Sequence, residues 1–330
     1  MMNKHEKSPC CQGTVLRFGG RRRQCRVCTK TWSVWQRKRG RRAVRVSVDL
    51  AHRFVRGRLL PIRAERSGHR QTKNERAYRL AKSRIRCARH CAWPSPPKYG
   101  PLIAIADGLI KYVEGRWHTW YIILVRHRNG DTAIALPAYH RIGTETAIGW
   151  KQAFDAVPSS IMSRIVALVC DGRNALVYEA KWRGWLLQRC HFHLIARLQS
   201  RRSKWKLSRH YEEGRLIYTL VKQVLTEPDE TVLEPMLNTL EEISWTNTSP
   251  EVRRVLSGFV NRCSEFRTYL AHPELGLPTT NNTAETLIGL IEETTRRSRG
   301  FASTAIIDEW ISVIIKTRGA IKCRGRNQQN

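Results

Sequence analysis

The distribution of apolar and polar residues changes character at the proline-rich segment 93–97. After it, short apolar runs rich in β-branched residues alternate with amphipathic stretches, which indicates a fold that mixes strands and helices. We expect strands over 102–106, 117–126, 131–139, 165–170 and 185–187, with the second and third joined in a hairpin across Asn129-Gly130. We expect helices over 144–154, through most of 196–270, over 278–296 and over 306–316.

The order of these elements predicts the fold class. Three adjacent strands are followed by a helix, a strand, a second helix and a further strand. This order predicts an α/β fold with a mixed, partly antiparallel sheet, which is the arrangement of ribonuclease-H-like domains. The long helical stretch that follows predicts a helical insertion.

The pattern before the proline-rich segment differs from the rest. After a basic connector at 37–48, it predicts short helices over 49–56 and 59–66, a turn at Ser67-Gly68 and a basic third helix over 72–85. Two short helices, a glycine-containing turn and a basic third helix are typical of a helix-turn-helix. The alternative is an arginine-rich helix that only faces solvent. The residues that the third helix would offer to DNA are Lys73, Asn74, Arg76, Arg79, Lys82 and Arg84.

Cysteines near the start of the chain have a spacing typical of zinc sites. Cys25 and Cys28 form a Cys-x-x-Cys pair, and Cys10 and Cys11 precede them across a segment with Gly19-Gly20. We expect a zinc-ribbon-like hairpin with these four thiols as ligands. The spacing is imperfect, because Ser8 occupies the place of the usual first cysteine and adjacent cysteines bind one ion with distorted geometry. His5 as a substitute ligand, and cysteines that bind no metal, are the alternatives.

Charge points to the class of partner. The net charge is +32, and residues 1–100 hold 28 lysines and arginines against 4 acidic residues, whereas the remainder holds 31 against 23. Such asymmetry indicates a polyanion, and nucleic acid fits better than a membrane surface because the basic stretches lack an apolar face. The ten cysteines fit a reducing compartment, and no apolar run is long enough to cross a bilayer. We expect a cytoplasmic, nucleoid-associated protein without a membrane partner.

These boundaries divide the chain into five predicted parts. They are a zinc-ribbon-like segment (1–36), a helix-turn-helix region (37–92), the first part of an α/β core (98–195), a helical insertion (196–275) and the completion of the core with a basic tail (276–330).

Two of the predicted strands run into Asp-Gly pairs, at Asp107 and at Asp171. If the strands are neighbours, both carboxylates lie at one edge of the sheet, where they suit Mg²⁺ or Mn²⁺. Glu285, on a later helix, is the candidate for a third ligand of a two-metal site. Asp-Gly is also a common turn, and Asn282 with Glu285 makes an ordinary capping-box-like start, so both positions have plain structural explanations. Other acidic residues rank lower because none follows a buried strand: Glu145, Asp155 and Glu179.

Four motifs in this order resemble the catalytic core of DDE transposases, closest to the Mutator-like and related prokaryotic insertion-sequence enzymes. They are IAIADG with Asp107, LVCDGRNAL with Asp171, Gln188-Arg189-Cys190-x-x-His193, and TTNNTAETL with Glu285 followed by RRSRGF. The resemblance covers roughly residues 100–302. It implies a ribonuclease-H-like core with a helical insertion between the second Asp and the Glu.

The resemblance also implies an activity and its partners. Asp107, Asp171 and Glu285 would hold Mg²⁺ or Mn²⁺ and catalyse cleavage at transposon ends, followed by strand transfer into target DNA. The partner would be double-stranded DNA, bound by a homo-oligomer. The basic residues after Glu285 that would contact this DNA are Arg296, Arg297 and Arg299.

Three alternatives stay open. Cys190 and His193 would order the wall of the active site by hydrogen bonding, or bind zinc together with His191 or another cysteine. The whole chain would be a non-catalytic DNA-binding regulator, such as a domesticated or decayed transposase. A third possibility is a metal-dependent nuclease that hydrolyses DNA without joining it.

Overall fold

The structure, a computed structural model, describes residues 7–17, 22–33, 91–128, 130–205, 211–246, 250–297 and 303–323. The chain forms two compact units, Met1–Arg45 and Val46–Asn330, each considered by itself. The predicted helix-turn-helix, with Lys73, Asn74, Arg76, Arg79, Lys82 and Arg84, lies outside the described residues, as do His5 and Arg299.

The first unit contains a small antiparallel sheet. Strands β1 (Val15–Arg17), β2 (Arg22–Cys25) and β3 (Thr31–Ser33) pair in the order β1-β2-β3. The turn between β2 and β3 holds the Cys25-x-x-Cys28 pair. A sheet this short buries little apolar surface, so other contacts must stabilise it.

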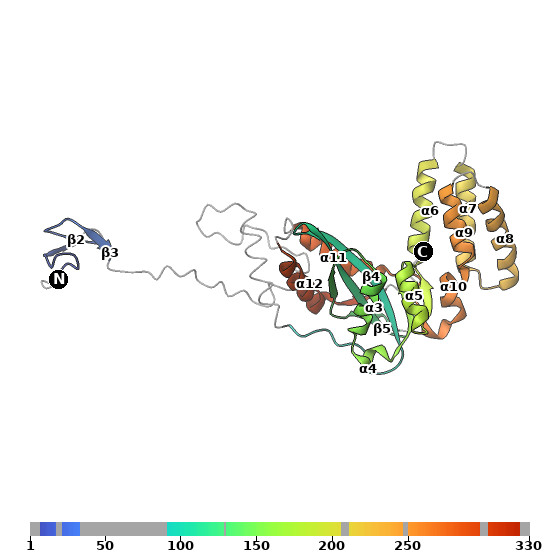
Figure 1. Ribbon diagram of the computed structural model, residues 1–330, viewed down its shortest axis with the longest axis horizontal. Helices are drawn as coiled ribbons and strands as arrows, with labels where there is room; N and C mark the ends of the chain where they lie inside the picture. Colours follow the sequence, from blue (N-terminus) through green and yellow to red (C-terminus); the bar gives the residue numbers. More distant parts are fainter. Residues whose placement is uncertain are drawn as a thin grey trace. The chain divides into compact units, whose positions relative to one another are not determined.

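A mixed seven-stranded sheet forms the centre of the second unit, which confirms the predicted α/β class (Figure 1). Its order is β10-β6-β5-β4-β8-β9, with β7 also paired to β5. β4 pairs antiparallel with β5 and parallel with β8, and β8 pairs parallel with β9. The strands are β4 (Leu102–Val113), β5 (Arg116–His127), β6 (Thr132–Ala135), β7 (Tyr139–Ile142), β8 (Ile165–Cys170), β9 (Leu186–Arg189) and β10 (Ala320–Lys322).

Two strand predictions were wrong in detail. β4 does not end at Asp107 but continues to Val113 and turns into β5 through Glu114 and Gly115, whose φ angles are +50° and +78°. Two successive residues with positive φ are typical of the tight turns that join twisted hairpins. The predicted strand 131–139 is two strands, β6 and β7, because Pro137 between them has no amide hydrogen for a sheet ladder.

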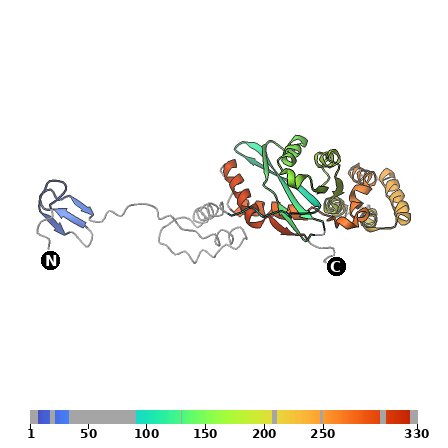
Figure 2. The same cartoon turned by 90° about the horizontal axis from the view of Figure 1, so that it is seen from below.

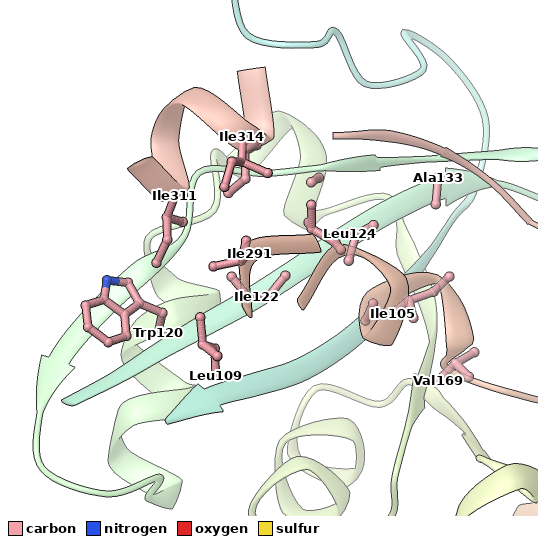
Figure 3. Packing of buried hydrophobic residues seen from close by; sticks show 14 of the residues in the cluster. Ile105, Leu109, Trp120, Ile122, Leu124, Ala133, Val169, Ile291, Ile311 and Ile314 are labelled. Atoms are coloured by element: carbon pink, nitrogen blue, oxygen red, sulfur yellow. The ribbon is translucent and has the colours of Figure 1, made fainter. Parts of the chain in front are cut away.

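Helices cover both faces of this sheet. On one face, α11 (Asn282–Arg297) and α12 (Thr304–Arg318) pack on Ile103, Ile105 and neighbouring side chains (Figure 3). On the other face, α3 (Ala147–Asp155) and α5 (Asn174–Trp182) pack on Leu102 and Ala104. Because β4 alternates between two buried faces, its first five residues form one continuous apolar run.

The stretch predicted as a helical insertion consists of helices that share a hydrophobic core, and we refer to it as the insertion (Figure 2). It starts at His191, earlier than predicted, because α6 follows β9 directly. The helices are α6 (His191–Trp205), α7 (Tyr211–Thr226), α8 (Glu230–Thr246), α9 (Pro250–Val260) and α10 (Cys263–Ala271); a short α4 (Ser159–Met162) precedes β8 and a 3-10 turn, η2 (Pro273–Leu275), follows α10. Among the described residues, no helix combines the length and the apolar character that crossing a bilayer requires.

Candidate active site

The sheet register brings Asp107 and Asp171 to the same level. β4 and β8 are parallel neighbours, and their last paired residues are Ile105 and Val169. Asp107 lies two residues after Ile105, and Asp171 lies two residues after Val169. Because side chains alternate along a strand, both aspartates belong to the same sheet face as Ile105 and Val169, which is the face that α11 covers. Both aspartates therefore lie just beyond the point where β4 and β8 stop pairing. Asp107 lies there in the middle of the long strand β4, and Asp171 directly follows the short strand β8.

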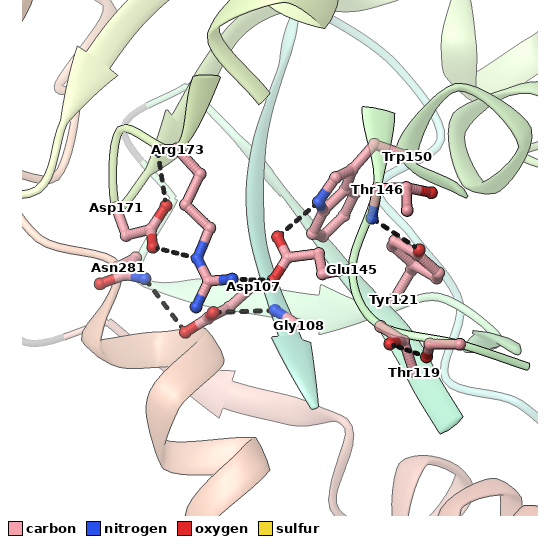
Figure 4. A network of polar contacts seen from close by, with 11 residues as sticks. Asp107, Gly108, Thr119, Tyr121, Glu145, Thr146, Trp150, Asp171, Arg173 and Asn281 are labelled. Carbon is pink, nitrogen blue, oxygen red and sulfur yellow. Dashed lines mark hydrogen bonds and ion pairs between the residues drawn. The ribbon is translucent and has the colours of Figure 1, made fainter. Parts of the chain in front are cut away.

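Asp107 lies in a partly buried, strongly acidic environment. Its Oδ1 accepts a hydrogen bond from the Gly108 amide at 2.8 Å, and its Oδ2 accepts one from Asn281 Nδ2 at 3.2 Å (Figure 4). Burial, followed by the negative charges of Asp171, Glu285 and Glu145, raises the pKa of Asp107 to about 7. Four carboxyl groups close enough to disturb one another in this way form a group to which a cation is strongly attracted.

Glu145 belongs to this acidic cluster, although the sequence pattern ranked it low. It lies just before α3, and its Oε1 accepts a hydrogen bond from Trp150 Nε1 at 2.7 Å. Burial raises the pKa of Glu145, and the charge of Asp171 adds to that rise. Glu145 does not directly follow a strand, so the strand-end rule could not find it; a clue in the sequence was Trp150, an indole donor five residues later, on α3.

Arg173 is the cation of the cluster. Its Nε donates to Asp171 Oδ2 at 2.9 Å, its backbone amide donates to Asp171 Oδ1 at 2.9 Å, and its guanidinium also forms an ion pair with Glu145. Figure 4 shows this side chain between the two carboxylates. The Arg173 side chain is 51% exposed, so the pairs are open to competition from other ions.

Glu285 approaches the cluster from α11. The helix begins at Asn282, so Asn282 is a helical residue rather than the cap that the capping-box interpretation required. Burial raises the pKa of Glu285, His193 opposes that rise and the charge of Asp171 adds to it. The Oε1 atom of Glu285 is inaccessible to solvent and has no hydrogen-bond partner, and it lies 3.5 Å from His193 Nδ1.

The motif Gln188-Arg189-Cys190-x-x-His193 has two structural roles. Gln188 and His191 face the insertion: Gln188 Nε2 donates to Phe266 O at 2.8 Å, and His191 Nε2 lies 2.7 Å from the same oxygen. Cys190 and His193 face Glu285 instead, and ligand atoms of these three residues lie within 4.8 Å of one another. His191 is therefore not part of that group.

The four cysteines of the first unit form a second metal-ligand group. Cys10, Cys11, Cys25 and Cys28 offer sulfur atoms that all lie within 4.8 Å of one another, with 3.1 Å between Cys10 and Cys28 and 3.2 Å between Cys11 and Cys25. The adjacent pair thus joins the group despite its unusual spacing, because a turn closed by the Gln12 amide and Ser8 O brings Cys10 beside Cys28 and Cys11 beside Cys25. The hydroxyl of Ser8, a fully buried residue, helps to lower the pKa of Cys25 to about 6. Four thiols so arranged can bind one metal ion, compatible with zinc.

No protein-family model matches the chain, and no curated protein is significantly similar to it in sequence. The resemblance to DDE transposases therefore stays a prediction that rests on the motifs. Of the predicted DNA-contacting residues near the end of the chain, Arg296 and Arg297 end α11.

Proposed function

We propose that this chain is a DDE-type DNA transposase with a ribonuclease-H-like core, which cleaves DNA at transposon ends and transfers the 3′ ends into target DNA. The observation that carries the proposal is the convergence of Asp107, Asp171 and Glu285, whose charges act on one another from β4, the end of β8 and α11. A mixed sheet with helices on both faces, and a helical segment between the second aspartate and the glutamate, are consistent with such a core. The basic first hundred residues support DNA as the partner.

The acidic cluster fits hard divalent cations. Burial and then repulsion between carboxylates raise the pKa of Asp107, and Asn281 Oδ1 and Glu285 Oε1 are buried oxygens without hydrogen-bond partners. Oxygen ligands of this kind suit Mg²⁺ or Mn²⁺. Asp107, Asp171 and Glu285 would hold the ions. Two such ions, when bound, activate a water or a DNA 3′ hydroxyl and stabilise the leaving oxygen.

The protein's own side chains orient this site. Asp107 and Asp171 are fixed relative to each other by neighbouring strands, and Asn281 holds Asp107 by a hydrogen bond. Trp150 fixes Glu145 in the same way. Arg173 compensates Asp171 and Glu145, and its exposed position leaves it free to exchange these carboxylates for a DNA phosphate. Preorganised side chains of this kind lower the reorganisation needed during phosphoryl transfer.

Strand transfer with Asp171→Asn tests the proposal. The DNA substrate carries the two sequences that flank the coding region, where the proposal requires inverted repeats, with Mg²⁺ or Mn²⁺ and a plasmid target. We expect the wild-type protein to join the 3′ ends, and we expect Asp171→Asn to lower joining by more than about 100-fold while DNA binding persists, because one carboxylate ligand is lost. Asp229→Asn is the matched control, since Asp229 lies at the exposed start of α8 and asparagine caps a helix equally well.

Each other outcome assigns the chain to another class of protein. Joining by Asp171→Asn at the wild-type rate would contradict the catalytic assignment. A wild-type protein that binds the repeats but neither cuts nor joins them is a DNA-binding regulator. In such a protein, Arg173 would keep its ion pairs with Asp171 and Glu145 when DNA is bound. A protein that cuts without joining is a nuclease.

A further inference from the structure

Cys190, His193 and Glu285 form a compact group beside the acidic cluster. Cys190 directly precedes α6 and His193 lies in its first turn, so a spacing of three residues places both on one side of the helix start. Glu285 meets them from the first turn of α11. The Cys190 sulfur, a His193 ring nitrogen and a Glu285 carboxylate oxygen all lie within 4.8 Å of one another.

Polar atoms in this group lack partners. His193 Nδ1 and Glu285 Oε1 are both inaccessible to solvent and neither has a hydrogen bond, although they lie 3.5 Å apart. A buried polar atom without a hydrogen-bond partner destabilises the folded state. A cation between the two atoms would satisfy both, whereas an ion pair with a protonated His193 would explain their approach but not the nearby thiol.

The thiol of Cys190 is the fully buried member of this group. The Asn281 amide donates to the sulfur at 3.4 Å. Amide hydrogens directed at a sulfur favour its thiolate form, which is the form that binds a metal.

The donor set selects the kind of metal. A thiolate, an imidazole and a carboxylate suit Zn²⁺, whereas Mg²⁺ prefers oxygen ligands alone. The His193 and Glu285 side chains are 31% and 30% exposed, so an ion and a water molecule can reach the group. Three protein ligands and one open position are a common arrangement for zinc.

We propose that Cys190, His193 and Glu285 form a zinc site, distinct from the four-cysteine group of the first unit. Zinc there draws the Glu285 carboxylate towards α6. If the proposed function holds, Glu285 is shared between the zinc and the acidic cluster, and zinc competes with Mg²⁺ for it.

Cobalt titration of the full-length chain tests the site. Co²⁺ replaces Zn²⁺ and gives a near-ultraviolet sulfur-to-cobalt absorption band when a thiolate binds it. The starting protein carries Cys25→Ser and Cys28→Ser, which remove two of the four thiols of the group in the first unit. We expect it to bind one Co²⁺ with this band and to release the ion when Zn²⁺ is added.

Variants in the starting protein assign the ligands. We expect Cys190→Ser to abolish the band, and His193→Gln or Glu285→Gln to weaken Co²⁺ binding by more than about 100-fold, beyond the usual effect of residues that only support a ligand. Cys263→Ser is the matched control, because Cys263 is another buried cysteine, on α10, and we expect it to leave the band unchanged.

Absence of the band in the starting protein, or its persistence in Cys190→Ser, would overturn the proposal. His193→Gln keeps the test decisive if Cys190→Ser fails to fold, because His193 is partly exposed: unchanged Co²⁺ affinity in that variant also overturns it. The titration needs no DNA, so the zinc site can fail while strand transfer is observed, and strand transfer can fail while the zinc site stands.

Discussion

At the scale of single residues, the candidate active site depends on carboxyl groups that repel one another. The pKa of Asp107 is raised to about 7 by burial and by three other acids, two of which, Asp171 and Glu145, form ion pairs with Arg173. A raised folded-state pKa means that the folded protein loses stability as the pH rises, because the unfolded chain releases the same proton more readily. The acidic cluster therefore lowers the stability of the fold as the pH rises, a cost that the proposed metal ions would offset.

Asp107→Asn tests this trade-off. The window of lost stability extends from the ordinary pKa of 3.8 up to about 7. In buffer without added divalent ions, we compare the free energy of unfolding of the variant with that of the wild type. We expect the difference in favour of the variant to be about 1–3 kcal/mol larger at pH 8 than at pH 5, since one pKa unit corresponds to about 1.4 kcal/mol. Urea unfolding at both values measures it. Asp229→Asn, an exposed control, should lack this gain, and an equal effect of Asp107→Asn at both pH values would contradict the prediction.

At the scale of elements, β9 and the start of α6 connect the sheet to the insertion. Gln188, fully buried in β9, donates to the carbonyl groups of Phe266 and Arg189 at 2.8 Å and accepts from the Tyr269 amide at 2.9 Å. Thr268 donates to Leu187 O as well. These bonds fix α10 against β9, and the same chain segment then presents Cys190 and His193 to α11.

Gln188→Met should loosen this junction. The replacement is similar in length but removes the hydrogen bonds that the Gln188 side chain makes to the Phe266 and Arg189 carbonyl groups and to the Tyr269 amide, so we expect a loss of about 2–4 kcal/mol in the free energy of unfolding. Hydrogen exchange should show faster exchange at the Tyr269 amide. Gln223→Met, on an exposed position of α7, is the control, expected to change stability by less than about 0.5 kcal/mol. Equal effects of the two substitutions would rule out an anchoring role for Gln188.

At the scale of the whole molecule, the two compact units differ in what stabilises them. The second has extensive cores on both faces of its sheet and a further core in the insertion. The first, among its described residues, buries only Ser8 and Cys25 fully. Because apolar contacts are so few, we expect the stability of this unit to depend on a metal ion bound by its four thiols.

Cys28→Ser should therefore unfold the first unit alone. We expect amides of β1, β2 and β3 to lose their protection from hydrogen exchange, while the thermal transition of the second unit stays within about 1 °C of the wild-type value, because the metal contributes folding energy only where it binds. Cys91→Ser, a half-buried cysteine of the second unit, is the control for loss of a thiol. Retained protection in Cys28→Ser would show that the small sheet is stable without a full set of ligands.

The sequence by itself determined the features that local patterns encode. Apolar runs gave the main strands and the α/β class, helical periodicity gave the insertion, and cysteine spacing gave the thiol group, because each depends on neighbours along the chain. Only the tertiary structure decided which side chains meet. Asp107 lies in the middle of β4 and not at its end, Glu145 joins the acids from the start of α3, and Cys190 and His193 face Glu285. β10, near the end of the chain, pairs with β6, which lies far earlier in the sequence. Such meetings depend on strand register and on packing between distant segments, which no local pattern of residues contains.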